Sequence, residues 1–329
     1  MMLISRRSAL QGLAAGALGL GALNLAACGR KKDADLAGVT LRAATYRGNP
    51  DSFFEQAGVA DTPYTLETAQ FAGGNLIAEA INAHSLDVGG MSEIPPIFIA
   101  AANPLVRIIA VLQGDVNNQV VLVPKDSPLQ ATADLKGKRV GYVRATTSQY
   151  MLLKILKEQG LTFADITPVA LSPQDGLAAF NQGSLDAWVI YGVVVQLARE
   201  AGARVLTTGL HRLSGNYLVA ASKDALADPL KKRAIGDYLQ RYAKTLAWIE
   251  ADYTRWARIR AQLTSIPEAA YIQEYRERSA GYRLLPVSDA AIASQQDVAD
   301  TFAAAGVIPA PVDVRPLWDD SLHEVLAKL

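Results

Sequence analysis

Short apolar runs alternate with amphipathic segments along most of the chain from residue 39 onward. Short apolar runs are typical of buried strands, whereas apolar positions with a 3.6-residue period are typical of helices. This pattern predicts strands over residues 39–45, 64–71, 86–91, 106–112, 120–124, 139–143, 167–171, 187–191, 203–207 and 217–221. It predicts helices from about residue 75, after Pro95, over 149–159, after Pro173, and over 235–256 and 290–304 in a mainly helical C-terminal third.

The order of these elements predicts an α/β fold with two lobes. Strands that alternate with helices favour largely parallel sheets covered by helices, and about 300 residues more often form two cores than one. We expect the chain to cross between lobes along residues 120–124 and 217–221, as a two-strand hinge. Lobe I would then comprise residues 39–124 and 217–329, and lobe II residues 125–216.

An internal echo supports two similar lobes. The segment Asn82-Ala83-His84-Ser85-Leu86-Asp87 returns as Asn181-Gln182-Gly183-Ser184-Leu185-Asp186. Asn and Ser-x-Asp are common turn residues, which would explain each copy separately. Because each copy ends a predicted helix and starts a predicted strand, we favour one helix–turn–strand unit used once in each lobe.

The N-terminus has the pattern of an export signal. Arg6 and Arg7 precede an apolar run over residues 10–27, which ends in the lipobox Leu25-Ala26-Ala27-Cys28-Gly29. This order predicts a signal peptide over residues 1–27, lipidation of Cys28 and a tether over residues 28–38. The protein would then be exported and held by lipid at a membrane facing the periplasm or the cell exterior. The segment around Arg6 also resembles a twin-arginine motif, with Ala9 where Phe is usual, so both export routes stay open.

Composition excludes several classes of function. The chain has 32 basic and 32 acidic side chains, which gives no electrostatic footprint for nucleic acid. Its one cysteine, Cys28, permits no disulfide within the chain, no thiolate metal site and, once lipidated, no cysteine nucleophile. His84, His211 and His323 lie far apart, without the spacing of metal ligands. With no phosphate-binding loop and no Gly-x-Ser-x-Gly elbow, we expect no enzyme, no metal and no cofactor.

Three predicted helix starts could bind an anion, since backbone N–H groups and the helix dipole favour negative charge there. They are Gly73-Gly74-Asn75 and Ser92 in lobe I, and Thr146-Thr147-Ser148 in lobe II. Ordinary N-capping would account for each of them separately. Trp188 and Tyr191 follow a strand and could cover an apolar ligand body, or else belong to the core. Arg47 and Arg278 could supply charge-assisted hydrogen bonds.

The chain resembles the solute-binding proteins of ABC importers for aliphatic sulfonates, taurine and nitrate over nearly all of its predicted mature length. The segments that carry the resemblance are Phe71-Ala72-Gly73-Gly74-Asn75, Ser85-Leu86-Asp87-Val88-Gly89, Glu93-Ile94-Pro95-Pro96, Val121-Leu122-Val123-Pro124-Lys125-Asp126-Ser127, Asp134-Leu135-Lys136-Gly137-Lys138, Gly183-Ser184-Leu185-Asp186-Ala187-Trp188 and residues 295–302. The resemblance implies a type II periplasmic-binding fold, with a mixed sheet flanked by helices in each lobe, that closes on an oxyanion. It also implies an ABC permease and its ATPase as partners of a monomeric protein.

Departures from the family pattern leave the ligand open. Tyr191-Gly192-Val193 stands where sulfonate binders usually have an aromatic residue followed by Asp-Pro, and the second-lobe turn is Thr146-Thr147-Ser148. We expect a sulfonate-like organic anion, an alkane or aryl sulfonate or taurine. The alternatives are another oxyanion such as nitrate or a sulfate ester, a pyrimidine precursor, or a desulfinase-like enzyme on the same fold. A receptor that senses rather than transports fits equally well. The residues expected to contact the ligand are Tyr46, Arg47, Gly73, Gly74, Asn75, Ser92, Glu93, Asn118, Thr146, Thr147, Ser148, Trp188, Tyr191 and Arg278.

Overall fold

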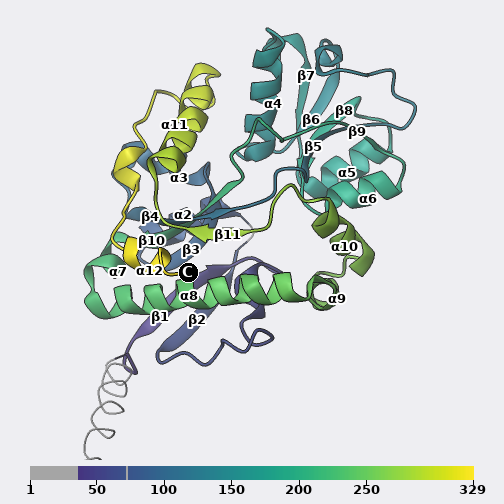
Figure 1. Ribbon diagram of the computed structural model, residues 1–329. Coiled ribbons are helices and arrows are strands. Elements are labelled where there is room, and N and C mark those ends of the chain that lie inside the picture. The colour runs from purple at the N-terminus through teal and green to yellow at the C-terminus, as the bar shows by residue number, and fades with distance from the viewer. Residues whose placement is uncertain (1–35, 72) are drawn as a thin grey trace, which may run out of the picture.

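The computed structural model describes residues 36–71 and 73–329, which form two lobes, each around its own sheet (Figure 1). The predicted signal peptide and the lipobox with Cys28 lie outside the described residues. No helix among those that are described is long and apolar enough to cross a membrane.

The first sheet is mixed, with the strand order β11-β4-β10-β3-β1-β2. β1 pairs in parallel with β2 and β3, whereas β10 runs antiparallel to both β3 and β4, and β11 runs antiparallel to β4. The strands are β1 Thr40–Thr45, β2 Thr65–Gln70, β3 Val88–Ser92, β4 Val106–Gln113, β10 Asn216–Ser222 and β11 Arg283–Leu285.

The second sheet is also mixed, with the order β7-β6-β8-β5-β9. β6 runs parallel to β7 and β8, and β5 runs antiparallel to β8 and β9. The strands are β5 Gln119–Val123, β6 Arg139–Tyr142, β7 Thr167–Ala170, β8 Ala187–Tyr191 and β9 Arg204–Thr208. Each predicted strand is present with its ends shifted by at most two residues, and only β11 has no sequence-based counterpart.

Helices cover both faces of each sheet. The first lobe has α2 Gly74–Asn82, α3 Pro95–Ile99, α7 Lys223–Ala227, α8 Pro229–Ala251, α9 Tyr253–Thr264, α10 Glu268–Glu277, α11 Asp289–Ala304 and α12 His323–Leu326, and the second has α4 Thr147–Glu158, α5 Pro173–Asn181 and α6 Val194–Glu200. Short 3-10 helices are η1 Pro50–Phe53, η2 Ala100–Ala102, η3 Thr132–Leu135, η4 Phe163–Asp165 and η5 Arg315–Leu317.

The single helix predicted over residues 235–256 is wrong, because two helices share that span. Asp252 leaves the helical region, with φ −151° and ψ 79°, and ends α8. Its carboxylate accepts a hydrogen bond from the backbone N–H of Arg255 at 3.0 Å, so it caps the start of α9. A capping aspartate inside a continuous amphipathic pattern therefore turns the chain without interrupting the pattern.

The crossings between the lobes also differ from the prediction. Residues 120–124 and 217–221 lie within the two sheets, as β5 and β10, so β5 belongs to the second lobe and not to the first. The chain instead crosses along residues 114–118 and 209–215. The backbone N–H of Gly114 donates to the carbonyl of Gly215 at 3.0 Å and ties the two crossings together. Gly215 has φ +74°, and a Cβ on Gly215 would lie only 2.5 Å from the carbonyl oxygen of Gly114. This close approach therefore requires glycine.

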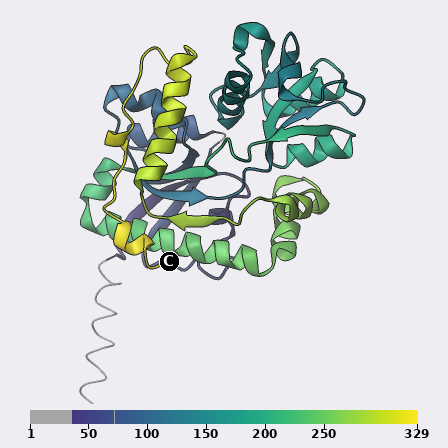
Figure 2. The same cartoon turned by 45° about the horizontal axis from the view of Figure 1, so that its top comes forward.

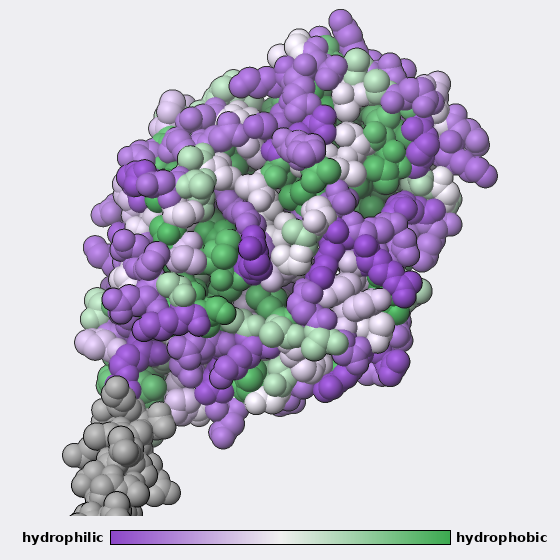
Figure 3. All heavy atoms as spheres, in the orientation of Figure 1, coloured by the Kyte–Doolittle hydropathy of each residue, from purple (hydrophilic) through white to green (hydrophobic). Residues whose placement is uncertain are grey.

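Each sheet buries apolar side chains on both faces. In the first lobe, Leu41, Ile109 and Ile235 join the core between the sheet and α8, which runs along the sheet in both ribbon views (Figures 1 and 2). In the second lobe, α4 covers one face, and α5 and α6 cover the other. On the face drawn in Figure 3, hydrophilic residues predominate, with hydrophobic patches between them.

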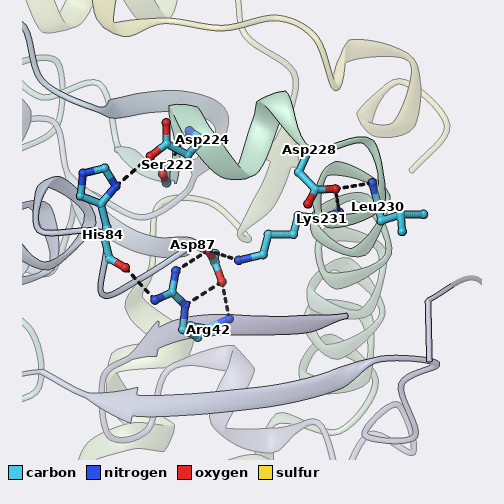
Figure 4. A network of polar contacts seen from close by, with 8 residues as sticks. All are labelled: Arg42, His84, Asp87, Ser222, Asp224, Asp228, Leu230 and Lys231. Carbon is cyan, nitrogen blue, oxygen red and sulfur yellow. Dashed lines mark hydrogen bonds and ion pairs between the residues drawn. The ribbon is translucent and has the colours of Figure 1, made fainter. Parts of the chain in front are cut away.

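The internal echo is confirmed as one structural unit used twice. Arg42 at the start of β1 binds Asp87 at 2.8 Å, and Arg139 at the start of β6 binds Asp186 at the same distance. In both lobes the aspartate also accepts the arginine's own backbone N–H, and the guanidinium reaches the carbonyl of the turn residue that precedes the strand. In the first lobe, Lys231 adds a second cation on Asp87 at 2.9 Å (Figure 4).

Candidate ligand-binding cleft

The carboxyl ends of the parallel strands place the candidate residues of each lobe at one sheet edge. In the first lobe, Tyr46 follows β1, Gly73 precedes α2, and Ser92 ends β3. In the second lobe, Thr146 caps α4 after β6, and Tyr191 ends β8. Open α/β sheets bind their ligands at such edges. Charge repulsion from Tyr191 of the second lobe contributes to the raised pKa of Tyr46 in the first lobe, so these two phenols lie near each other.

Two tyrosines form the first-lobe side. The hydroxyl of Tyr46 lies 3.2 Å from where a Cβ on Gly74 would be, at the start of α2. Burial raises the pKa of Tyr46 to about 12, and a hydrogen bond with the phenol of Tyr217 partly opposes that shift. The ring of Tyr217 lies against the backbone of Gly90, where a Cβ would be only 2.9 Å from it. The two glycines therefore make the room that the two phenols occupy.

On the second-lobe side, two of the three expected hydroxyl groups are already used. Thr146 donates its hydroxyl to the carbonyl of Val143 at 2.7 Å and accepts the N–H of Ser148. Ser148 donates to the carbonyl of Val189 at 2.6 Å and accepts the N–H of Val143. Each hydroxyl has a single proton. The expectation that Thr146 and Ser148 donate hydroxyl protons to an anion is therefore wrong, because these hydroxyls hold the start of α4 on the sheet.

Four of the expected residues keep side-chain donors that make no hydrogen bond within the described residues. Arg47 and Asn75 are exposed, and Ser92 and Thr147 are partly exposed. Three of them, Arg47, Asn75 and Ser92, belong to the first lobe, and Asn75 is the second residue of α2. Thr147 belongs to the second lobe and is the first residue of α4. Together with the N-termini of these two helices, they are hydrogen-bond donors at the carboxyl-end edges of the two sheets.

Trp188 does not reach the cleft. Its side chain is fully buried on β8, where it packs 5.9 Å from the ring of Phe180. The backbones of Gly141 and Gly176 also lie against its indole, since a Cβ at either glycine would come within 2.9 Å of it. The expectation that Trp188 covers the ligand is therefore wrong, and of the expected aromatic pair only Tyr191, which is partly exposed, remains at the edge.

Glu93 and Arg278 are engaged in the first lobe. The carboxylate of buried Glu93 accepts hydrogen bonds from Ser214 at 2.8 Å and from Asn216 at 3.3 Å. These bonds connect the residues just before α3 to the end of the second crossing and the start of β10. Burial raises the pKa of Glu93. Arg278 forms two hydrogen bonds to Glu250, at 2.6 and 2.7 Å, and stacks on Tyr275. Their side chains are therefore used to hold the lobe together.

Asn118 lies in the first crossing and donates to Glu274 of α10 at 3.0 Å. It lines a polar cavity of about 300 Å³ between α6 and α10, with Gln196, Arg199 and Glu277 among its other walls. The residues that line this cavity include neither Tyr46 nor Tyr191, nor any residue of the starts of α2 and α4. A second cavity of about 240 Å³ surrounds the Arg42–Asp87 network (Figure 4).

Sequence reasoning missed the close packing of Tyr217 against the backbone of β3, because Tyr217 lies in an apolar run whose pattern indicates only a strand. A signal was nevertheless present in Gly89-Gly90. Glycine inside a strand often marks the close approach of another group. Here Gly90 admits the ring of Tyr217 from the neighbouring β10.

Comparisons with known proteins agree with this architecture. A family model described as NMT1/THI5 like matches residues 43–230. A protein of Escherichia coli (strain K12) named as aliphatic sulfonates-binding is 33% identical over 267 residues, which are 79% of this chain and 81% of that protein.

Two solved structures share both lobes. The periplasmic aliphatic sulphonate binding protein SsuA from Escherichia coli has a TM-score of 0.76 at 26% identity, over 86% of this chain and 92% of that one. The alkanesulfonate-binding protein SsuA from Xanthomonas axonopodis pv. citri, solved bound to MOPS, has a TM-score of 0.74 at 28% identity, over 85% of this chain and 98% of that one. They confirm the two-lobed α/β fold expected from the sequence.

Proposed function

Because the chain belongs to the NMT1/THI5-like family, we propose that it is the solute-binding component of an ABC importer and binds a sulfonate-like organic anion between its lobes. The observation that carries this proposal is the 33% identity to an aliphatic sulfonates-binding protein along most of both chains. The free donors of Arg47, Asn75, Ser92 and Thr147 at the facing sheet edges add support, since they suit a group with several acceptor oxygens.

The chemistry of a sulfonate suits this set of groups. Its three oxygens accept hydrogen bonds and donate none, and they share one negative charge. Backbone N–H groups at two helix starts and hydroxyl groups can surround such a head without a buried countercharge. Arg47 adds a charge-assisted hydrogen bond from the first lobe. Binding and release need no chemical step, and the relatives to which the chain is similar are named as binding proteins.

Delivery to a membrane permease and its ATPase follows from this role. We propose that the protein acts as a monomer and that a lipid on Cys28 holds it at the membrane. The lipobox and the charge-free run before it support the anchor. Cys28→Ser is expected to leave ligand binding intact and to release the protein from the membrane fraction. A variant that stays attached and is released only by detergent would contradict the anchor.

Titration calorimetry tests the ligand class. Wild-type protein is titrated with alkyl and aryl sulfonates, taurine, MOPS, nitrate and sulfate, with a neutral sugar and a neutral amino acid as controls. We expect heat with at least one sulfonate and none with the controls. If only nitrate or sulfate binds, the ligand is an oxyanion other than a sulfonate. If only a neutral solute binds, the proposal is contradicted.

A further inference from the structure

The second crossing is held to a different lobe at each of its ends. At its start, Gly209 donates its backbone N–H to a carbonyl of β5 at 2.7 Å, and Leu213 donates its own to the carbonyl of Gly209 at 2.9 Å. The side chain of Arg212 binds Glu158 of α4 at 2.9 Å. Residues 209–213 therefore form a turn that is fixed to the second lobe.

Ser214, the next residue, is fixed to the first lobe. Its hydroxyl donates to the carboxylate of Glu93 at 2.8 Å and accepts the backbone N–H of Asn216 at 3.1 Å. The side chain of Asn216 donates to the same carboxylate at 3.3 Å. The crossing therefore changes from one lobe to the other between Leu213 and Ser214.

Glu93 joins this point of the crossing to the candidate ligand site. It is buried and directly follows Ser92, which ends β3 at the carboxyl edge of the first sheet. Its backbone carbonyl accepts a buried hydrogen bond of 2.9 Å from the side chain of Gln295 in α11. The main chain of Glu93 is thus held inside the first lobe, while its carboxylate reaches the crossing.

We propose that Glu93 is a positioning residue for ligand binding, because it fixes Ser214 as the pivot about which the second lobe moves. This pivot keeps Ser92 of the first lobe and Thr147 of the second within a narrow range of relative positions. The inference rests on the proposed function for the presence of a ligand that contacts both lobes.

Loss of this anchor would widen the range of lobe arrangements. Bending would then extend from Ser214 to Gly215, and glycine has more backbone freedom than any other residue. A smaller fraction of molecules would have the arrangement that binds the ligand, and the apparent affinity falls in proportion to that fraction.

Substitutions on both sides of the hydrogen bond test the anchor. Ser214→Ala removes the hydroxyl, whereas Ser214→Thr keeps it at an exposed position that has room for a methyl group. Glu93→Gln changes the partner in the first lobe and keeps the shape of the side chain. The matched control is Ser172→Ala. Ser172 also donates to a carboxylate, that of Asp175 at 2.7 Å, and accepts a backbone N–H at 3.1 Å, but within the second lobe alone.

Spin labels report the range of lobe arrangements without any ligand. One label is attached through Lys244→Cys on α8 and the other through Gln159→Cys at the end of α4, both at exposed positions. The full chain also carries Cys28→Ser, so that these are its two cysteines. Double electron–electron resonance then measures the distribution of distances between the lobes.

In the free protein, Ser214→Ala is expected to broaden this distribution, and Ser214→Thr to leave it as in wild type. Glu93→Gln is expected to broaden it as well, because an amide offers one acceptor oxygen where a carboxylate offers two. The control Ser172→Ala is expected to change nothing.

Calorimetric titration with a sulfonate that binds the wild type measures the effect on affinity. Ser214→Ala is expected to weaken binding about two- to fivefold, and Ser214→Thr is expected to bind as the wild type does. The double variant with Glu93→Gln and Ser214→Ala is expected to lose less than the product of the two single losses, because both substitutions disrupt the same hydrogen bond.

Each result decides one point. An unchanged distance distribution in Ser214→Ala would overturn the anchor, whatever the ligand is. A broader distribution with unchanged affinity would overturn the positioning role. Single losses that multiply in the double variant would also contradict it, because Glu93 and Ser214 would then act independently. If the distribution broadens as expected but the wild type binds no sulfonate, the proposed ligand class fails while the anchor at Glu93 stands.

Discussion

Hydroxyl groups that look alike in the sequence have different roles once their protons are counted. Thr146, Thr147 and Ser148 form one run. Two of the three hydroxyls donate to backbone carbonyls of the same lobe, and the hydroxyl of Thr147 makes no hydrogen bond within the described residues. The sequence indicates a helix start here, whereas the partner of each hydroxyl depends on Val143 and Val189, which reach it only through the fold.

Thr147→Ala and Ser148→Ala should therefore differ in what they damage. Thr147→Ala is expected to weaken sulfonate binding about tenfold or more, because it removes a donor to a charged group, and to leave stability nearly unchanged. Ser148→Ala is expected to lower the free energy of unfolding by about 1–3 kcal/mol, because it leaves the N–H of Val143 and the carbonyl of Val189 without their partner. Calorimetric titration and urea denaturation of both variants check this. Equal losses of stability in the two variants would contradict a structural role for the Ser148 hydroxyl that Thr147 does not share.

Asp51 makes the stability of the first lobe depend on pH. Its Oδ2 accepts from the hydroxyl of Tyr238 at 3.1 Å, and its buried Oδ1 has no hydrogen-bond partner among the described residues. Burial raises the pKa of Asp51 to about 6, although hydrogen bonds from Thr45 and Tyr238 lower it. The folded state therefore binds more protons than the unfolded state between about pH 4 and 6, and the charged form costs stability above that window.

Asp51→Asn should remove this cost. Relative to wild type, the variant is expected to gain about 2 kcal/mol in free energy of unfolding on going from pH 4.5 to pH 7.5, because a rise of the Asp51 pKa by about two units takes effect largely within this interval. Urea denaturation at both pH values measures the gain, with the exposed Asp61→Asn as the control for an amide substitution. A difference between Asp51→Asn and wild type that is the same at both pH values would show that Asp51 does not titrate as inferred.

At the scale of elements, hydrophobic periodicity predicted the strands within two residues and most of the helices. It failed where a polar residue redirects the chain without breaking the pattern, as at Asp252 between α8 and α9. It also placed both crossings inside strands. The apolar run at residues 120–124 indicates a buried strand but not which sheet the strand joins, since β5 would be equally apolar in either sheet. Likewise, the pattern showed Trp188 as apolar and aromatic and left open which face of β8 it takes.

The repeated helix–turn–strand unit provides a comparison between the lobes. Asp87 has a side chain 3% exposed and binds two cations, whereas Asp186 is 32% exposed and binds one. Asp87→Asn is expected to cost about 3–5 kcal/mol, because it leaves Arg42 and Lys231 without a buried countercharge. Asp186→Asn is expected to cost about 1 kcal/mol or less, as in other exposed pairs. Equal changes in the denaturation midpoints of the two variants would contradict the expected difference between the two stability losses.

For the whole molecule, two sets of contacts join the lobes beside the crossings. Tyr150 and Lys154 of α4 both bind Asp297 of α11, the lysine at 2.9 Å. On the other side, Arg199 and Gln196 of α6 bind Glu277 of α10. α4 carries Thr147 at its start, so the α4–α11 contact sets where a second-lobe donor lies relative to the first lobe.

Asp297→Asn should then weaken ligand binding without touching the ligand. We expect about a two- to fivefold loss of affinity, because a smaller fraction of molecules has the lobes in the arrangement that binds. Asp289→Asn on the same helix is the control, since Asp289 pairs with Arg315 of its own lobe. Calorimetric titration of both variants measures the effect, and an unchanged affinity in Asp297→Asn would mean that this contact does not govern the relation of the lobes.

A crystal structure of the protein with a bound alkanesulfonate tests the central claim most directly. The account predicts the sulfonate group between the starts of α2 and α4, within hydrogen-bond distance of Tyr46, Arg47 and Thr147, with Trp188 still buried in the second-lobe core. A sulfonate bound instead in the polar cavity between α6 and α10, or outside the two facing sheet edges, would contradict it.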